Sequence, residues 1–240
     1  IILLLFFCFP EVIISSSTSY YFRTLGINDG LSQSTVNAIL QDQKGFMWIG
    51  TKDGLNQYDG QECRVFQKEN SSLGNNFITA LYEDCEGYIW VGTDAGVYIY
   101  NPVQEAFQFL DTEIASSGEK ITRAVTWITS DSQNNIWISV DNQGLFCYNR
   151  GKKNLTKVVS CGKSGIANVT HFWFYAGQLW IARYEDNLYV SKDNSSFNAF
   201  NDVDGEDIFK GLVINSYVEG LHNCLYVGTS KGLMEINLTS

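Results

Sequence analysis

One motif occurs five times in this chain at nearly constant spacing. The copies are WIGTKDGLNQYD from Trp48, WVGTDAGVYIYN from Trp90, WISVDNQGLFCYN from Trp137, WIARYEDNLYVS from Trp180 and YVGTSKGLMEIN from Tyr226. Their first residues lie 42, 47, 43 and 46 residues apart. A period of about 40–45 residues built from short strands is typical of β-propeller blades. The repeat therefore predicts an all-β propeller with five recognisable four-stranded blades.

Each repeat divides into a four-stranded antiparallel meander. In the second copy, strands are predicted at 78–84, 88–93, 97–101 and 106–110, with turn residues between them. The same division places the blades at about 34–67, 77–110, 121–159, 167–200 and 208–237. Polar linkers at 68–76, 111–120, 160–166 and 201–207 join one blade to the next.

The two ends of the predicted propeller, 20–240, are complementary. The fifth copy stops at Ser240 after its third strand, whereas YYFRTL (20–25) precedes blade one without a partner. Such a pair is how propellers close their ring, which removes exposed sheet edges. We therefore interpret 20–25 as the ring-closing outer strand. The ring is either a closed five-bladed one, or a larger seven-bladed ring of which this chain is a part, and we favour the larger ring.

The first nineteen residues predict a truncated export signal. An apolar run from Ile1 to Phe9 ends at Pro10 and is followed by small residues. The run is too short to span a bilayer and resembles the apolar region and cleavage zone of a secreted chain. A buried strand is the alternative. A signal would place the domain in the periplasm or elsewhere outside the cytoplasm.

Composition excludes several classes of partner and site. The 240-residue chain has a formal net charge of −10 and no basic run, which argues against nucleic acid as a partner. Only His171 and His222 are present and no CxxC occurs, so no zinc constellation is available. The scattered cysteines are expected mostly to be small buried hydrophobes. We expect no metal, no cofactor and no catalytic residue in this chain.

The glycine-rich copies themselves are interpreted as framework. No helical period follows them, as a phosphate-binding loop requires, and the acidic spacing of a calcium loop is missing. Glycine supplies the positive φ of a hairpin turn, and Asp42 and Asp84 begin further turns. The structural repeat residues are Trp48, Gly50, Thr51, Gly54, Trp90, Gly92, Thr93, Gly96, Trp137, Gly144, Trp180, Tyr226, Gly228, Thr229 and Gly232.

Two stretches, GLSQSTVNAILQDQKGFMWIGTKDGLNQYDG (30–60) and ITALYEDCEGYIWVGTDAGVYIYNP (78–102), resemble the two-component-regulator propeller repeat. The match is strong in blades one and two and weak in blade four. The resemblance implies the extracytoplasmic sensor region of a Bacteroides-type hybrid two-component system. In that family, propellers precede a membrane span and a histidine kinase, and oligosaccharides are typical signals. The resemblance thus implies an oligosaccharide ligand, a homodimer formed through propellers, and a membrane reached only through downstream segments.

Departures from the repeat indicate candidate ligand-binding residues. One inner-strand column reads Asn37, Thr79, Thr126, Thr170 and about Asn215, which predicts a polar ring lining a central channel. The neighbouring column reads Ala38, Ala80, Trp127, His171 and about Ser216. Trp127 and His171 either fill wider gaps between blades or offer a stacking face and a hydrogen-bonding group near the channel.

Blade four departs most from the repeat. Its expected glycine–threonine turn is replaced by Ala182, Arg183, Tyr184, Glu185 and Asp186. Arg183, Tyr184 and Glu185 suit sugar hydroxyls, although a solvated turn explains them equally. This turn is expected on the same face as the blade-to-blade linkers, and we predict that this face binds the ligand or a partner. A propeller enzyme acting on polysaccharide and a protein-binding scaffold are the alternative functions.

Overall fold

The computed structural model describes residues 22–158, 169–183, 188–194, 196–201, 205–206, 208–220 and 224–237. A short 3-10 helix, η1 (Ile27–Asp29), precedes the sheets. Blade one contains β1 (Val36–Gln41), β2 (Met47–Thr51), β3 (Gly54–Tyr58) and β4 (Cys63–Phe66). Blade two contains β5 (Ile78–Glu83), β6 (Ile89–Thr93), β7 (Gly96–Asn101) and β8 (Ala106–Phe109).

The remaining blades follow the same order. Blade three contains β9 (Val125–Ser130), β10 (Ile136–Val140), β11 (Gly144–Asn149) and β12 (Asn154–Lys157). Blade four contains β13 (Val169–Tyr175), β14 (Gln178–Arg183), β15 (Leu188–Ser191) and β16 (Asn198–Ala199). Blade five contains β17 (Ile214–Glu219), β18 (Cys224–Thr229) and β19 (Gly232–Asn237). Four sheets therefore have four strands and the fifth has three within the described residues, each paired in chain order.

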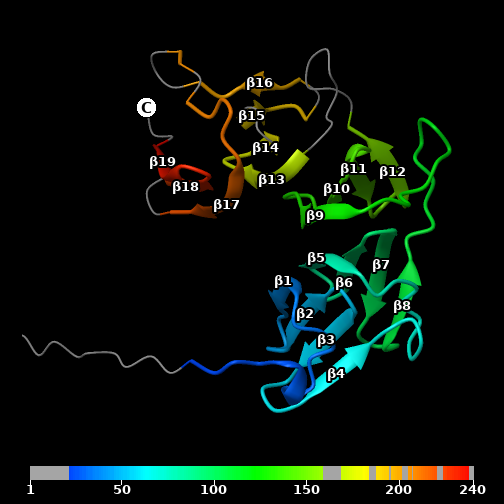
Figure 1. Cartoon of the computed structure of the whole chain (residues 1–240). Coiled ribbons are helices and arrows are strands. Elements are labelled where there is room, and N and C mark those ends of the chain that lie inside the picture. The colour runs from blue at the N-terminus through cyan, green and yellow to red at the C-terminus, as the bar shows by residue number, and fades with distance from the viewer. Residues whose placement is uncertain are drawn as a thin grey trace, which may run out of the picture.

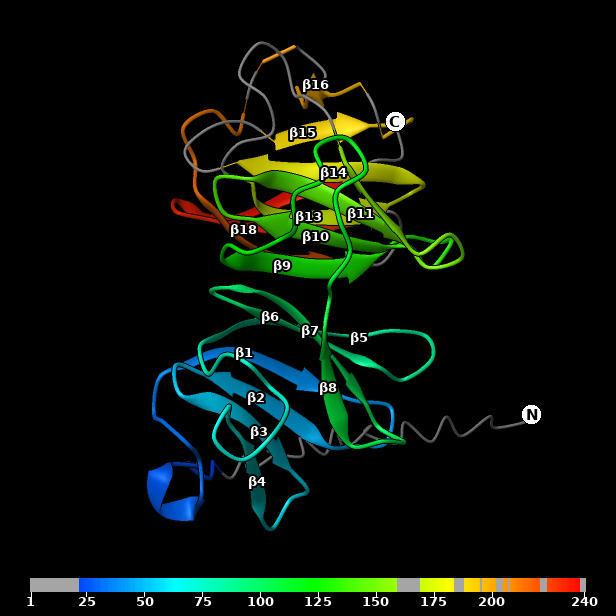
Figure 2. The ribbon, with the colours of Figure 1, turned by 90° about the vertical axis from the view of Figure 1, so that its right-hand side faces the viewer.

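The five sheets form an open arc around a central space (Figure 1). The first strand of each sheet lies on the inner side of the arc and the last on the outer side. Inner strands pack in sequence, β1 against β5, β5 against β9, β9 against β13, and β13 against β17. Turned by 90°, the sheets lie one above another (Figure 2). The chain is thus an all-β propeller of five blades, and the described residues do not close into a five-bladed ring.

The Asp-x-x-Gly turns between the first and second strands are confirmed as turn formers. One carboxylate oxygen of Asp42 accepts the amides of Lys44 and Phe46, and the other accepts the indole Nε1–H of Trp48 at 2.8 Å. Blades two and three repeat this arrangement around Asp84 with Trp90 and Asp131 with Trp137. The aspartate therefore both closes the turn and fixes the repeat tryptophan.

The glycine–threonine turns between the second and third strands are also framework. The Thr51 hydroxyl donates to the Gly54 carbonyl at 3.0 Å and accepts the amide of Asp53. Thr93 and Thr229 close their turns in the same way. Gly54 has a φ of 120°, a conformation that favours glycine. No phosphate or metal chemistry is needed to explain these residues.

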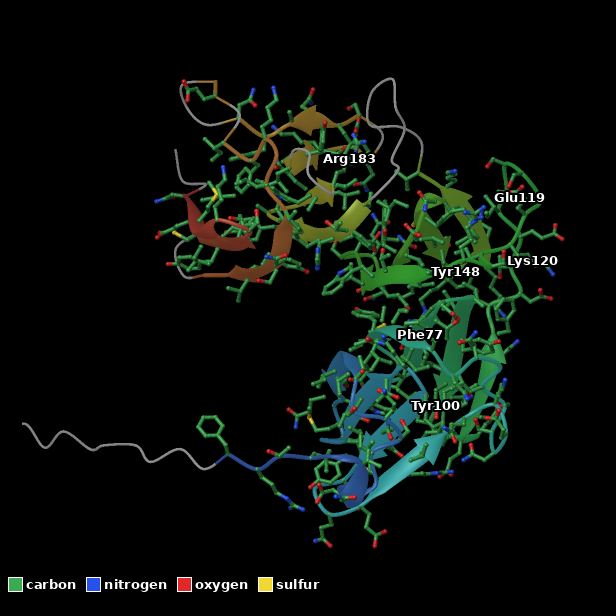
Figure 3. The ribbon with its side chains drawn as sticks, in the orientation of Figure 1. Phe77, Tyr100, Glu119, Lys120, Tyr148 and Arg183 are labelled. Carbon is green, nitrogen blue, oxygen red and sulfur yellow. The ribbon has the colours of Figure 1, made fainter. Side chains whose placement is uncertain are left out.

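Packing between blades explains the glycine in the second strand. A Cβ added to Gly50 would lie 2.5 Å from a methyl carbon of Ile78 in the next blade. The repeat tryptophan faces the same neighbour, because Trp48 contacts Tyr100 of blade two with ring centroids 5.0 Å apart. Trp90 contacts Tyr148 of blade three at 5.6 Å, and Figure 3 labels both tyrosines. The core is therefore a series of apolar layers between adjacent sheets.

The predicted strand at 20–25 is not observed in its described part. Residues 22–25 have no strand pairing, and the side chain of Phe22 is 96% exposed. A strand needs a neighbouring edge to supply backbone hydrogen bonds, and blade five lies across the open side of the arc from this segment (Figure 1). The inner strands expected from 121 and from 208 begin later, at Val125 and Ile214, because the preceding residues complete the linkers. The predicted export signal, 1–19, lies outside the described residues.

The prediction that most cysteines are buried is wrong for the four that are described. Only Cys224 is buried, Cys63 and Cys147 are half-buried, and Cys85 is exposed. Cys85 is exposed because it occupies the second position of the blade-two turn, where the side chain points to solvent. Burial raises the pKa of the Cys147 thiol to about 12, so this thiol stays protonated at neutral pH.

Candidate functional site

Each inner strand contains a β-bulge at the same position, and the predicted polar column occupies it. The pairing register skips one residue between Val36 and Ala38, and the skip recurs in every blade. The skipped residues are Asn37, Thr79, Thr126, Thr170 and Asn215. A bulge turns its extra residue out of the regular alternation. The five bulge residues all have short polar side chains, and each side chain therefore has the same orientation relative to its own sheet.

A cavity of about 370 Å³ opens along the inner strands of blades one to four. Its lining combines both predicted columns with an apolar row: Asn37, Ala38, Ile39, Thr79, Ala80, Leu81, Thr126, Trp127, Ile128, Thr170 and His171. We call this cavity the channel site. It brings together polar groups, aliphatic side chains and one aromatic pair, which is the composition expected of a ligand pocket.

Trp127 and His171 meet across the boundary between blades three and four. Their ring centroids lie 5.1 Å apart with the planes tilted by 57°. Trp127 pairs with Ser139 in its own sheet and His171 with Ala182, whereas Ala38 and Ala80 pair with glycines. Both side chains line the channel site, and their rings touch each other.

Three polar atoms of the channel site are buried and have no hydrogen-bond partner in the described part of the chain. They are Nε1 of Trp127, Nδ1 of His171 and Oγ1 of Thr79. An unpaired buried polar group costs about 1–3 kcal/mol, so such groups commonly mark a place where a ligand or water completes the bonding. The site therefore offers an indole donor, an imidazole nitrogen and a hydroxyl.

The protonation state of His171 follows from its surroundings. Burial lowers the pKa of this imidazole below its ordinary value of 6.5, although a hydrogen bond to the backbone of Ile214 opposes the shift. Nδ1 of His171 has no partner among the described residues, so it is the ring nitrogen open to a ligand, and in the neutral ring an unprotonated Nδ1 is an acceptor. Trp127 and His171 thus present a donor and an acceptor side by side.

The lowered pKa of His171 predicts a pH dependence of stability. Below pH 6.5 the unfolded chain binds a proton more readily than the folded one, so protonation favours unfolding. The stabilisation by neutral His171 is complete above pH 6.5 and is lost as pH falls from 6.5 through the lower folded pKa. We expect the melting temperature to fall less between pH 7 and pH 5 in His171→Gln than in the parent chain. Equal slopes in both proteins would contradict this assignment.

The structure does not place Arg183 in the channel site. Arg183 ends β14, and its guanidinium lies over the ring of Tyr189 in the same blade, 5.7 Å from the centroid (Figure 3). Tyr184 and Glu185 lie outside the described residues. In other blades the corresponding turn bonds to a segment that leads into an inner strand, since Gly54 N donates to Asn76 O, before β5, and Ser230 N to Val213 O, before β17. In these blades the turn and the linker residues therefore share a face, whereas the blade-four turn lies outside the described residues.

Sequence reasoning missed the apolar row of the channel site. Ile39, Leu81 and Ile128 follow the two predicted columns by one residue, and Ile39 is 62% exposed. Residues two apart in a regular strand point to the same face, away from the residue between them, and the bulge disturbs this alternation, so that three consecutive positions of an inner strand line the channel site. The signal in the sequence was the repeated apolar residue at that third position.

Over the described ranges, no group of three or more His, Cys, Asp or Glu side chains is close enough to hold a metal ion. Within the same described residues, no helix is both long enough and apolar enough to cross a membrane.

Comparison with known proteins confirms the predicted resemblance. Residues 30–53 and 72–95 match the family described as two component regulator propeller. Over 53 residues the chain is 40% identical to histidine kinase P4 of Formosa agariphila, a segment that covers 22% of this chain and 4% of that protein.

Solved structures support the propeller fold. The extracellular domain of a hybrid two-component system from B. thetaiotaomicron superposes with a TM-score of 0.68 at 24% identity, covering 90% of this chain and 35% of the other. The extracellular domain of a one-component system from the same organism gives a TM-score of 0.68 at 19% identity, covering 84% of this chain and 27% of the other. The chain thus spans about a third of the length of these proteins.

Proposed function

We propose that this chain, which carries two-component regulator propeller repeats, is the ligand-sensing extracytoplasmic propeller of a hybrid two-component histidine kinase. We propose further that its ligand is an oligosaccharide. The observation that carries this proposal is the channel site, where four blades contribute polar groups around Trp127 and His171. In this proposal kinase activity resides in other segments of the sensor, and this chain is not an enzyme.

The chemistry of the channel site suits a neutral, hydroxyl-rich ligand. Its lining residues include no carboxylate, lysine or arginine. A sugar hydroxyl both donates and accepts, so it can bond to the acceptor Nδ1 of His171 and the donor Nε1 of Trp127. The indole ring and the apolar row offer area for the C–H face of a sugar ring. An anionic ligand would lack a counter-charge there.

A glycan array on the propeller, followed by calorimetry with the strongest hit, tests this proposal. A neutral oligosaccharide that binds and is recovered intact supports a sensor. Release of cleavage products would favour an enzyme acting on polysaccharide. Binding of a protein but of no glycan would favour a scaffold. If the chain is a sensor, it lies outside the cytoplasm. The effect of ligand binding then passes through a homodimer of propellers to the membrane and the kinase.

The turn after β14 is a second part of the proposed ligand surface. Replacing Arg183 and Tyr184 together by alanine is expected to weaken glycan binding without unfolding the domain. The reason is that the corresponding turns of other blades lie against linker residues, and on that face the planar donor of Arg183 could reach hydroxyl groups. Calorimetry with a confirmed glycan measures the change. Unchanged affinity with an unchanged circular dichroism spectrum would restrict the ligand to the channel site.

A further inference from the structure

The polar side chains at the bulges of the inner strands do not all have the same partners. The side-chain amide of Asn37 in blade one donates to the Ile78 carbonyl of blade two at 2.8 Å. The hydroxyl of Thr126 in blade three lies 3.4 Å from two carbonyls, those of Ser139 in its own sheet and Val169 in blade four. Asn37 and Thr126 therefore help to hold the inner strand of one blade to that of the next.

Thr79 in blade two is the exception among the bulge residues of blades one to four. In blade four the Thr170 hydroxyl donates to the Ala182 carbonyl at 3.3 Å, but Oγ1 of Thr79 is buried and has no partner in the described part of the chain. The equivalent carbonyl, that of Gly92, is present in its sheet. A buried hydroxyl without a partner lowers stability, and valine has nearly the same shape without that cost. The hydroxyl of Thr79 thus has no structural task in the unliganded protein.

The place of Thr79 in the channel site gives its hydroxyl a different use. Thr79 lines the cavity from β5 together with Ala80 and Leu81, so it supplies the one polar side chain that this strand contributes. The side chain as a whole is half-buried. Rotation about its Cα–Cβ bond exchanges the hydroxyl and the methyl group and can turn the hydroxyl into the cavity. A hydroxyl in that position both donates and accepts a hydrogen bond.

Thr79 and the aromatic pair lie at different ends of the channel site. β5, which carries Thr79, packs on β9, and β9 packs on β13, which carries His171 (Figure 1). The ring of Trp127 contacts His171 of blade four at 5.1 Å and Tyr217 of blade five at 6.5 Å between centroids, so it is directed away from β5. Adjacent sheets pack roughly 10 Å apart face to face, and less where their inner strands converge. A sugar ring that stacks on Trp127 therefore leaves the Thr79 end to a second ring.

We propose that Thr79 is a specificity-determining residue of the channel site, where its hydroxyl bonds to a hydroxyl group on the second sugar ring of the ligand. This inference rests on the proposed sensing function and assigns the residue by which the site distinguishes a disaccharide from a single sugar. The first ring occupies the aromatic end at Trp127 and His171, which offers the larger contact area. The second ring extends toward blade two and supplies the partner that Oγ1 of Thr79 lacks.

Replacing Thr79 by valine tests this assignment, because the variant removes the hydroxyl and retains the shape of the side chain. Calorimetry with the neutral disaccharides and trisaccharides of the glycan array, each compared with its constituent monosaccharides, measures the preference for the longer sugar. We expect Thr79→Val to reduce this preference by about fivefold, which corresponds to about 1 kcal/mol, the contribution of one hydrogen bond. Monosaccharide affinity should stay within about twofold of the parent value, because the aromatic end is unchanged.

Stability measurements separate a ligand contact from a structural role. The melting temperature of Thr79→Val should equal or exceed that of the parent, because the lost hydroxyl has no partner in the unliganded protein. Thr126→Val should lower the melting temperature, because it loses the contacts to the carbonyls of Ser139 and Val169. A melting temperature of Thr79→Val as low as that of Thr126→Val would show that the hydroxyl is structural and would overturn the assignment.

Two matched variants control the binding measurement. Thr79→Ser retains the hydroxyl and should retain the preference for the longer sugar. Thr156→Val removes a hydroxyl from β12, on the outer side of blade three, where it donates to the Cys147 carbonyl. Its affinities for both kinds of sugar should equal those of the parent. An equal loss of mono- and disaccharide affinity in Thr79→Val would indicate a general disturbance of the site and contradict a role in specificity.

The remaining outcomes distinguish this inference from the proposed function. A parent chain that prefers a disaccharide, together with an unchanged preference in Thr79→Val, would overturn the role of Thr79 and leave the sensing proposal intact. Equal affinity of the parent for mono- and disaccharides would do the same. An absence of binding to every sugar of the array in the parent chain would overturn the proposed function and, with it, the assignment of Thr79.

Discussion

Replacing Asp84 by alanine is expected to lower the free energy of unfolding by about 3–5 kcal/mol, the cost of breaking a buried charged network. Asp84 is 2% exposed and accepts hydrogen bonds from the amides of Glu86 and Tyr88 and from Trp90 Nε1. Its removal leaves these three donors without their acceptor and takes one of two carboxylates from the guanidinium of Arg150, which retains Glu86. Denaturant unfolding followed by tryptophan fluorescence measures the loss.

Asp42→Ala is the matched control for Asp84→Ala. Asp42 makes the same three hydrogen bonds to its turn and to Trp48, and among the described residues no arginine pairs with it. The difference between the two variants therefore reports the contribution of Arg150. A loss below about 1 kcal/mol for Asp84→Ala would show that water replaces the carboxylate, and that the network is not what fixes the blade.

Replacing Trp127 by alanine is expected to weaken oligosaccharide binding by roughly thirtyfold, which corresponds to about 2 kcal/mol. The variant removes an aromatic face and an indole N–H that has no partner within the described protein. Blades one and two already have alanine at this position, in Ala38 and Ala80, so the strand tolerates the change. Calorimetry with the glycan identified on the array measures the affinity.

Two further variants show whether a loss of affinity in Trp127→Ala comes from the aromatic ring, from the indole N–H or from a general effect of mutation. Trp127→Phe retains a ring but no donor, so its affinity should fall between that of the parent and that of Trp127→Ala. Val103→Ala, at an exposed turn of blade two away from the channel site, should bind as the parent does. Parent-like affinity in Trp127→Ala, with melting behaviour unchanged, would show that the channel site does not bind the glycan.

The sequence predicted the blades because their determinants are local. A hairpin needs alternating side chains and a residue that tolerates positive φ, and both recur in WIGTKDGLNQYDG and its copies. The expected strands at 78–84 and 106–110 differ from the observed ones by one residue at an end. The repeat also made the departures at Trp127 and His171 visible, because blades one and two have alanine at the same position.

The sequence was less informative wherever two blades meet. Nothing in the spacing of Asp84 and Arg150 shows that residues 66 positions apart form an ion pair, because the pair depends on the rotation from one sheet to the next. The predicted strand at 20–25 failed in its described part for the same reason. Its formation depends on an edge elsewhere in the ring and not on its own residues.

The sequence by itself determined the all-β repeat, the turns and the position of the two unusual side chains on the inner strands. Periodicity and turn chemistry depend on residues close together in the chain, so both can be predicted from the amino-acid sequence alone. Only the tertiary structure decided that a bulge aligns the polar column, that Trp127 touches His171, and that Arg150 of blade three pairs with Asp84 of blade two. These features arise from contacts between sheets, whose free energy depends on the relative placement of residues distant in the chain.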